Sequence, residues 1–185
     1  MAENTGSSRP SVDQPLAIER SGIMGLINDY ITLTKPPIIS LLLITAIGGL
    51  FLAAEGIPPL QTLALVCIGG ALGAGGANAI NHFLDQDIDA IMSRTIKRPV
   101  ASNRISPISA LAFGITLNIG AFLVLTFGVN LLAAALTLAA TLFYVLVYTG
   151  WLKRNTPQNI VIGGAAGAIQ PMVGWAAVTG DLDLS

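Results

Sequence analysis

Five long apolar segments constrain this chain more than any other feature of its sequence. Each is close to the roughly 20 residues that an α-helix needs to cross a bilayer. They are expected at about residues 37–55, 60–84, 108–128, 130–149 and 158–178. Only 10% of the 185 residues are charged, whereas soluble domains carry about 25%. The sequence therefore predicts an all-α protein, a polytopic bundle of transmembrane helices.

The residues before the first span divide into two parts. Residues 1–20 are rich in Ser, Pro and charge and lack the apolar core of a signal peptide, so they are predicted to be a disordered cytoplasmic tail. Residues 21–34 mix apolar and polar positions at helical spacing and are expected to lie along the membrane interface. Residues 21–185 then form one transmembrane domain. At its last span, Thr156 is expected to be the N-cap and Pro157 the first helical residue.

The distribution of basic residues predicts the orientation of the spans. All nine Lys and Arg lie in the tail, just before the first span, or in two alternate connections: Arg9, Arg20, Lys35, Arg94, Lys97, Arg98, Arg104, Lys153 and Arg154. The other connections, about 55–59 and 128–130, hold none. By the positive-inside rule, the N-terminus and both basic connections face the cytoplasm. The near-zero net charge of −1 gives no reason to expect a nucleic-acid partner.

A polar stripe closes the second span. Asn81, Asp85 and Asp89 are four residues apart, so on a continuous helix they share one face. Two carboxylates and an amide one turn apart suit a hard cation such as Mg²⁺, which is often held by a few carboxylates together with substrate phosphates. Asn78 lies one turn earlier near the same stripe. Asp87 points to roughly the opposite side and is expected to pair with a basic residue or to be solvated.

Basic residues follow the stripe, and they are candidate ligands for a diphosphate: Arg94, Lys97 and Arg98, with Lys153 and Arg154 from the other cytoplasmic connection. Guanidinium and ammonium groups bind phosphate oxygens through charge-assisted hydrogen bonds. The same residues could instead be topology determinants that pair with the interfacial carboxylates, and spacing leaves both interpretations open. Stripe and cations together predict a metal–diphosphate site at a membrane surface.

Other conspicuous residues have simpler interpretations. His82, the sole histidine, is expected to be a hydrogen-bonded helix residue rather than a heme ligand or proton carrier. Tyr144 and Tyr148 are expected to pack or to anchor the interface. The run Gly163–Gly167 lies inside an apolar span, so it predicts close helix packing rather than a phosphate loop. The glycines of the second span predict the same kind of packing: Gly69, Gly73 and Gly76.

The polar stripe and the sequence that follows it, Arg94-Thr95-x-x-Arg98-Pro99, resemble the UbiA superfamily of intramembrane aromatic prenyltransferases. Several runs are similar to one branch of it, the protoheme IX farnesyltransferases: Leu33-Thr34-Lys35-Pro36, Asp85-Gln86-Asp87-Ile88-Asp89, Ile105-Ser106-Pro107 and Tyr148-Thr149-x-x-Leu152-Lys153-Arg154-x-Thr156-Pro157-Gln158-Asn159-Ile160-Val161-Ile162-Gly163-Gly164-Ala165-Ala166-Gly167. The resemblance covers roughly residues 28–181. It implies nine spans around a central cavity, of which about five are expected here, and a second Asp-rich motif without a counterpart in this sequence. The chain is accordingly expected to be an N-terminal part of a longer enzyme and inactive alone.

The resemblance also implies a reaction, in which the farnesyl group of farnesyl diphosphate is transferred to a vinyl group of heme b to give heme o. Heme b is then a substrate, not a cofactor. Asn81, Asp85 and Asp89 are implied to be catalytic and to hold Mg²⁺, and the five cations to bind diphosphate. The implied location is the cell inner membrane, with a heme A synthase or a terminal oxidase assembly as a candidate recipient of heme o. Two alternatives stay open: a prenyltransferase for a quinone precursor such as 4-hydroxybenzoate, and a non-catalytic multispan protein that uses the stripe as an ion site.

Overall fold

The computed structural model describes residues 22–156 and 158–182, so the expected tail at 1–20 lies outside it. The described residues form helices, turns and loops, without a strand. In chain order the helices are α1 (Ile23–Thr34), α2 (Pro36–Ala53), α3 (Leu60–Leu84), α4 (Gln86–Ile91), α5 (Pro107–Gly128), α6 (Leu131–Leu142), the π-helix η1 (Phe143–Leu152), α7 (Lys153–Asn155) and α8 (Asn159–Thr179). Five helical segments are long and apolar enough to cross a membrane. The predicted all-α, multi-pass architecture is confirmed.

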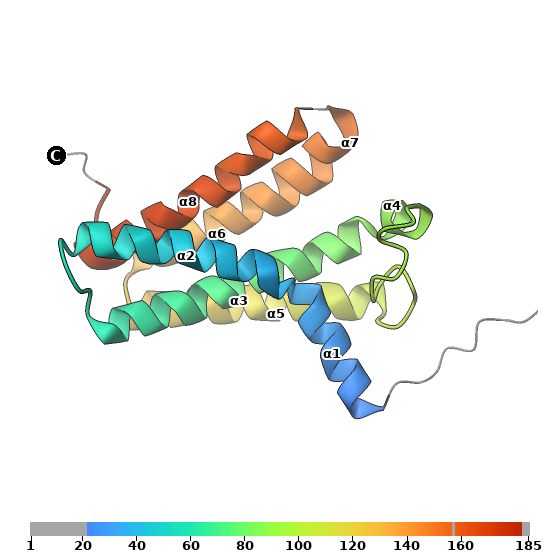
Figure 1. Ribbon diagram of the computed structural model, residues 1–185, viewed down its shortest axis with the longest axis horizontal. Helices are drawn as coiled ribbons and strands as arrows, with labels where there is room; N and C mark the ends of the chain where they lie inside the picture. The colour runs from blue at the N-terminus through green and yellow to red at the C-terminus, as the bar shows by residue number, and fades with distance from the viewer. Residues whose placement is uncertain (1–21, 157, 183–185) are drawn as a thin grey trace, which may run out of the picture.

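The central span is α3, which runs alongside α2 and α5 in the bundle (Figure 1). Its glycines allow this contact because a side chain would fill the space between helices. A Cβ atom on Gly76 would lie 2.6 Å from the carbonyl oxygen of Gly114, and one on Gly69 would lie 2.5 Å from Leu125. Lipid tails are as apolar as core side chains, so close packing of small residues holds transmembrane helices together. The packing role predicted for these glycines is confirmed.

The fourth span is longer than its hydropathy predicts. Its apolar run predicts an end near residue 149, whereas α6, η1 and α7 form one helical segment, Leu131–Asn155. Helical structure continues until Thr156, whose extended backbone (φ −146°, ψ 140°) fits the steric restriction on a residue before proline. Lys153 and Arg154 therefore lie on the last helical turn rather than in a loop, and their side chains project from a fixed backbone.

The start of the last span also differs from the prediction. Helix α8 begins at Asn159 after Gln158, and not at residue 157 after a Thr156 N-cap. The Thr156 hydroxyl accepts a hydrogen bond from the backbone N–H of Gln158 (3.3 Å), which closes a turn outside the helix. Pro157 lies outside the described residues.

Helix α1 and the 92–106 loop lie at the same end of the bundle as α4 and α7 (Figure 1). Arg104 joins the two, since its Nε donates to both carboxylate oxygens of the buried Asp29 at 3.0 Å. The rings of Tyr30 and Phe113 meet edge to face beside this ion pair, with centroids 4.9 Å apart. Several apolar side chains of α1 are exposed, among them Ile23. This exposure suits the interfacial position predicted for residues 21–34.

Candidate functional site

The predicted polar stripe lies at the junction of two helices rather than on one continuous helix. Helix α3 ends at Leu84, and Asp85 has φ −92° and ψ 4°, in the sparsely populated bridge region. Backbone hydrogen bonds nevertheless cross the junction, from the Asp85 N–H to Asn81 (2.9 Å) and from the Asp89 N–H to Asp85 (2.8 Å). The spacing of one turn is kept while α4 begins as a separate helix.

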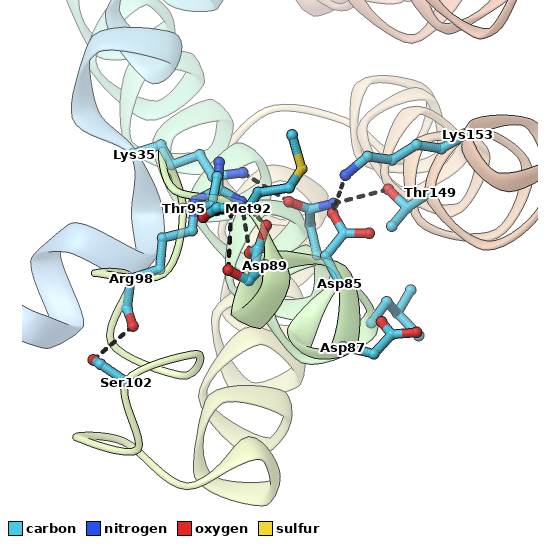
Figure 2. A network of polar contacts seen from close by, with 12 residues as sticks. Lys35, Asp85, Asp87, Asp89, Met92, Thr95, Arg98, Ser102, Thr149 and Lys153 are labelled. Carbon is cyan, nitrogen blue, oxygen red and sulfur yellow. Dashed lines mark hydrogen bonds and ion pairs between the residues drawn. The ribbon is translucent and has the colours of Figure 1, made fainter. Parts of the chain in front are cut away.

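Asn81 connects three elements at the centre of the site. Its Oδ1 accepts a hydrogen bond from Lys35 Nζ at 2.7 Å. Its Nδ2 donates to Asp85 Oδ2 at 2.7 Å and to Thr149 Oγ1 at 3.2 Å. Asn81 is buried, and these contacts join the α1–α2 corner, α3 and the π-helix η1 (Figure 2). The side chain thus fixes the relative positions of a cation and a carboxylate.

Asp85 is fully buried, and its two carboxylate oxygens differ in their hydrogen bonding. Oδ2 accepts from Asn81 and from Lys153 Nζ, the latter at 2.5 Å. Oδ1 has no hydrogen-bond partner among the described residues. A buried carboxylate oxygen without a partner is costly, because its hydration is lost and nothing replaces it. This oxygen is the strongest local indication of a ligand-binding role.

The second carboxylate of the stripe is also paired with a cation. Arg98 Nη1 lies 2.9 and 2.7 Å from the two oxygens of the buried Asp89. The Thr95 hydroxyl donates to the Asp89 carbonyl at 3.1 Å, and the Ser102 hydroxyl donates to the Arg98 carbonyl at 2.8 Å. The loop that follows α4 therefore folds back on it and directs Arg98 into the cluster.

Lys35 enters the site through an uncommon backbone conformation. It forms the corner between α1 and α2 with φ 54° and ψ 68°, in the left-handed region that non-glycine residues rarely adopt. Pro36 and Pro37 then begin α2, where their missing N–H groups cost little. Burial lowers the pKa of Lys35 to about 8, and the nearby cations Arg98 and Lys153 act in the same direction, against the two carboxylates.

Asp87 points away from the cluster, as its position in the sequence predicts, and forms a separate ion pair. Arg154 Nη1 and Nη2 contact its two oxygens at 2.9 and 2.8 Å, and Nη2 also donates to the carbonyl of Leu84 at 2.8 Å. These hydrogen bonds lower the pKa of the Asp87 carboxyl. The exposed pair ties α7 to the end of α3.

The structure brings together only part of the predicted set. Arg94 and Lys97 are exposed, and their side chains form no hydrogen bond or ion pair within residues 22–156 and 158–182. The expectation that His82 is hydrogen-bonded is wrong, because both ring nitrogens lack a partner among the described residues. Two members of the site were missed, Lys35 and Thr149. Both lie in runs that resemble the protoheme IX farnesyltransferases, and Lys35 is also a lone cation before Pro-Pro on the predicted cytoplasmic side. Neither signal placed them beside Asn81.

Thr149 provides a direct test of the network around Asn81. Replacement of Thr149 by Val removes the hydroxyl that accepts from Asn81 and leaves a buried N–H without a partner, which costs ~1–2 kcal/mol. We expect the affinity for a diphosphate ligand to fall about tenfold, measured by isothermal titration of the purified protein. Thr149→Ser keeps the acceptor and should retain near-normal affinity. Equal affinities for the Val and Ser variants would remove Thr149 from the site.

An apolar cavity of about 360 Å³ lies between α2, α3, the fourth span and α8. Its polar lining includes Asn78, one turn before the site, and the buried Gln170. The rings of Tyr144 and Tyr148 stack at 5.4 Å and form part of its wall. Gly163 approaches Tyr148 so closely that a Cβ would lie 2.3 Å from the ring, which confirms a packing role there. Cavities of this size and character bind small apolar molecules.

The charges of the cluster favour an anion. The two carboxylates, Asp85 and Asp89, face three cations, Lys35, Arg98 and Lys153, which leaves one excess positive charge (Figure 2). A divalent metal also fits the donor set, because the unpartnered Asp85 Oδ1 and the Asp89 carboxylate are the hard oxygen ligands that Mg²⁺ prefers. The described residues contain no group of three or more His, Cys, Asp or Glu that could hold an ion alone. A metal here needs further oxygens from the ligand.

Fold and site together define a multi-pass membrane protein with a cluster of charged side chains around two buried carboxylates, beside an apolar cavity. Residues 42–185 match the model of the UbiA prenyltransferase family. The chain belongs to the UbiA prenyltransferase family.

Individual relatives agree with this assignment. The chain is 56% identical to the protoheme IX farnesyltransferase of Symbiobacterium thermophilum over 158 residues, which cover 85% of this chain and 53% of that protein. It is 49% identical to the protein of the same name from Azorhizobium caulinodans over all 185 residues, 57% of that protein. The match to the Roseiflexus protein of that name is 50% over 95% of this chain and 32% of the relative. The chain thus spans about half the length of these relatives or less. No solved structure matches it.

Proposed function

We propose that the protein transfers the farnesyl group of farnesyl diphosphate to a vinyl group of heme b, which gives heme o and releases diphosphate. The observation that carries this is the cluster of half-buried cations, Lys35, Arg98 and Lys153, around the buried carboxylates of Asp85 and Asp89, beside an apolar cavity. A polyprenyl diphosphate has the same two parts, a highly charged head and an apolar tail. The names of the relatives support heme b as the acceptor.

In the proposed reaction the bond between farnesyl C1 and the diphosphate oxygen breaks, and its electron pair leaves with the diphosphate. The vinyl group then forms a bond to C1, water adds to the resulting carbocation, and a proton is lost. The cations of the cluster stabilise the charge that develops on the leaving group, because such preorganised charges act strongly in a site that excludes water. The apolar wall of the cavity limits access of water to the allylic cation.

Asp85 and Asp89, with Asn81 as a third oxygen donor, are the proposed ligands of a divalent metal, which we take to be Mg²⁺. Prenyltransferases of this family generally use a divalent metal with their diphosphate substrates, and the metal supplies Lewis-acid stabilisation of the leaving group when bound. A metal held by Asn81 Oδ1 would share or take over the oxygen that accepts from Lys35 Nζ. The Lys35 ammonium would then be placed to contact diphosphate oxygens.

The outer part of the diphosphate site is assigned to Arg94, Lys97 and Arg154. Arg94 and Lys97 are exposed on the loop that carries Arg98, and Arg154 lies one residue beyond Lys153. The positive-inside rule supports a cytoplasmic position for the whole cluster in the cell inner membrane. The proposal includes delivery of heme o to a heme A synthase or a terminal oxidase.

Complementation tests the reaction. The complete reading frame from the genome would be expressed in a bacterium that lacks its own heme O synthase, and the extracted hemes separated by chromatography. We expect heme o in the complemented strain and none with an empty vector. A well-expressed, membrane-inserted protein that yields no heme o would contradict heme b as the acceptor. Labelled farnesyl diphosphate appearing in a 4-hydroxybenzoate product would instead identify a quinone-precursor prenyltransferase.

A further inference from the structure

His82 is a buried polar residue that the proposed reaction does not use. Its side chain lies on α3 immediately after Asn81, and the residue is 2% exposed. Neither Nδ1 nor Nε2 has a hydrogen-bond partner among the described residues. Folded proteins pair nearly all of their buried polar side chains, so such a group calls for an explanation.

His82 lies on α3 next to the residues that connect the charged cluster. It lies one turn after Asn78, whose Nδ2 donates to the carbonyl of Thr34 at 2.9 Å, beside the Lys35 corner. The preceding residue, Asn81, accepts a hydrogen bond from Lys35 Nζ at 2.7 Å and donates one to Asp85 Oδ2 at 2.7 Å. His82 therefore lies close to the cations that surround Asp85 and Asp89.

The chemistry of the ring suits an anionic ligand. A neutral imidazole has one N–H donor and one acceptor nitrogen. Its N–H can donate to a phosphate oxygen without adding charge to a cluster that already holds three cations. We propose that His82 is an additional substrate-binding residue, and that its ring N–H donates a hydrogen bond to an oxygen of the bound diphosphate. The inference rests on the proposed function, because the anion is the diphosphate head of the prenyl substrate.

Thermal unfolding with and without ligand tests this role. The full-length protein in nanodiscs would be heated with Mg²⁺ alone and with Mg²⁺ and inorganic diphosphate, followed by tryptophan fluorescence. Affinity for diphosphate would be measured in parallel by isothermal titration. His82→Leu removes an unpaired buried polar group, so the ligand-free protein should melt at the same temperature or higher. Its diphosphate affinity should fall roughly 10- to 100-fold, the loss expected for one hydrogen bond to a charged group.

Two further variants identify the donor nitrogen and protect the test against misfolding. Asn places its amide N–H near the position of Nδ1 and Gln near that of Nε2, so either His82→Asn or His82→Gln should recover most of the affinity. Thr126→Val is the matched control, since Thr126 Oγ1 is another buried atom without a partner, on α5 outside the charged cluster. This variant should leave diphosphate binding unchanged.

The outcomes separate this inference from the proposed function. Diphosphate binding by His82→Leu equal to that of the wild type would overturn the role of His82, and heme o formation in the complementation experiment would still support the reaction. A His82→Leu protein that is less stable without ligand and binds normally would make His82 a structural residue. A wild-type protein that binds no diphosphate would overturn both.

Discussion

Asp85→Asn is expected to abolish heme o formation, with a loss of at least about 100-fold in the complemented strain. Asparagine has nearly the same size but lacks the negative charge. The variant keeps one oxygen, so it cannot both accept a hydrogen bond from Lys153 and offer a second oxygen to a metal. Removal of one partner from a buried pair also leaves the other charge uncompensated. Heme extraction with quantification against the amount of membrane-inserted protein measures the effect.

Asp87→Asn is the matched control, because Asp87 lies only two residues away and is also paired with a basic side chain. That pair is exposed, and exposed ion pairs contribute little. We expect heme o formation within about threefold of the wild type. Similar losses in both variants would mean that the local charge, rather than the buried oxygen of Asp85, is what matters, and full activity of Asp85→Asn would contradict the proposed site.

Gly49→Ala is expected to have the largest effect on folding. Helices α2 and α8 pack so closely that a Cβ on Gly49 would lie 2.1 Å from the carbonyl oxygen of Pro171. Backbone atoms cannot move aside as a flexible side chain can, so the helices must separate. Overpacking of this kind costs ~1–3 kcal/mol, which for a chain of this size corresponds to a fall of several degrees in melting temperature. Thermal unfolding in nanodiscs measures it.

The neighbouring Gly48 serves as the control, since a Cβ there meets no atom within 4 Å. Gly48→Ala should be neutral or slightly stabilising, because alanine has the higher helix propensity. Gly174→Ala should repeat the effect of Gly49→Ala from the other helix, where a Cβ would lie 2.0 Å from the Ala46 carbonyl oxygen. Equal stability of the Gly48 and Gly49 variants would show that the close contact of α2 and α8 does not limit stability.

The sequence by itself determined four of the spans and the polar stripe of the candidate site. A segment that crosses a bilayer must be apolar over about 20 residues and must satisfy its backbone within a helix, so hydropathy alone located α2, α3, α5 and α8. The spacing of Asn81, Asp85 and Asp89 fixed their relation along the chain, because neighbouring turns are coupled by local hydrogen bonds.

Only the tertiary structure decided which cations reach the carboxylates. Lys35 and Asn81 are 46 residues apart, and Asn81 and Thr149 are 68 apart, so their contacts depend on how whole helices pack and rotate. The π-helix η1 sets the direction of Lys153, and its wider turn is not visible in hydropathy. Local sequence determines local geometry. The pairing of charges and the lack of a described partner for the His82 nitrogens follow instead from long-range packing, which the spacing of residues in the sequence does not show.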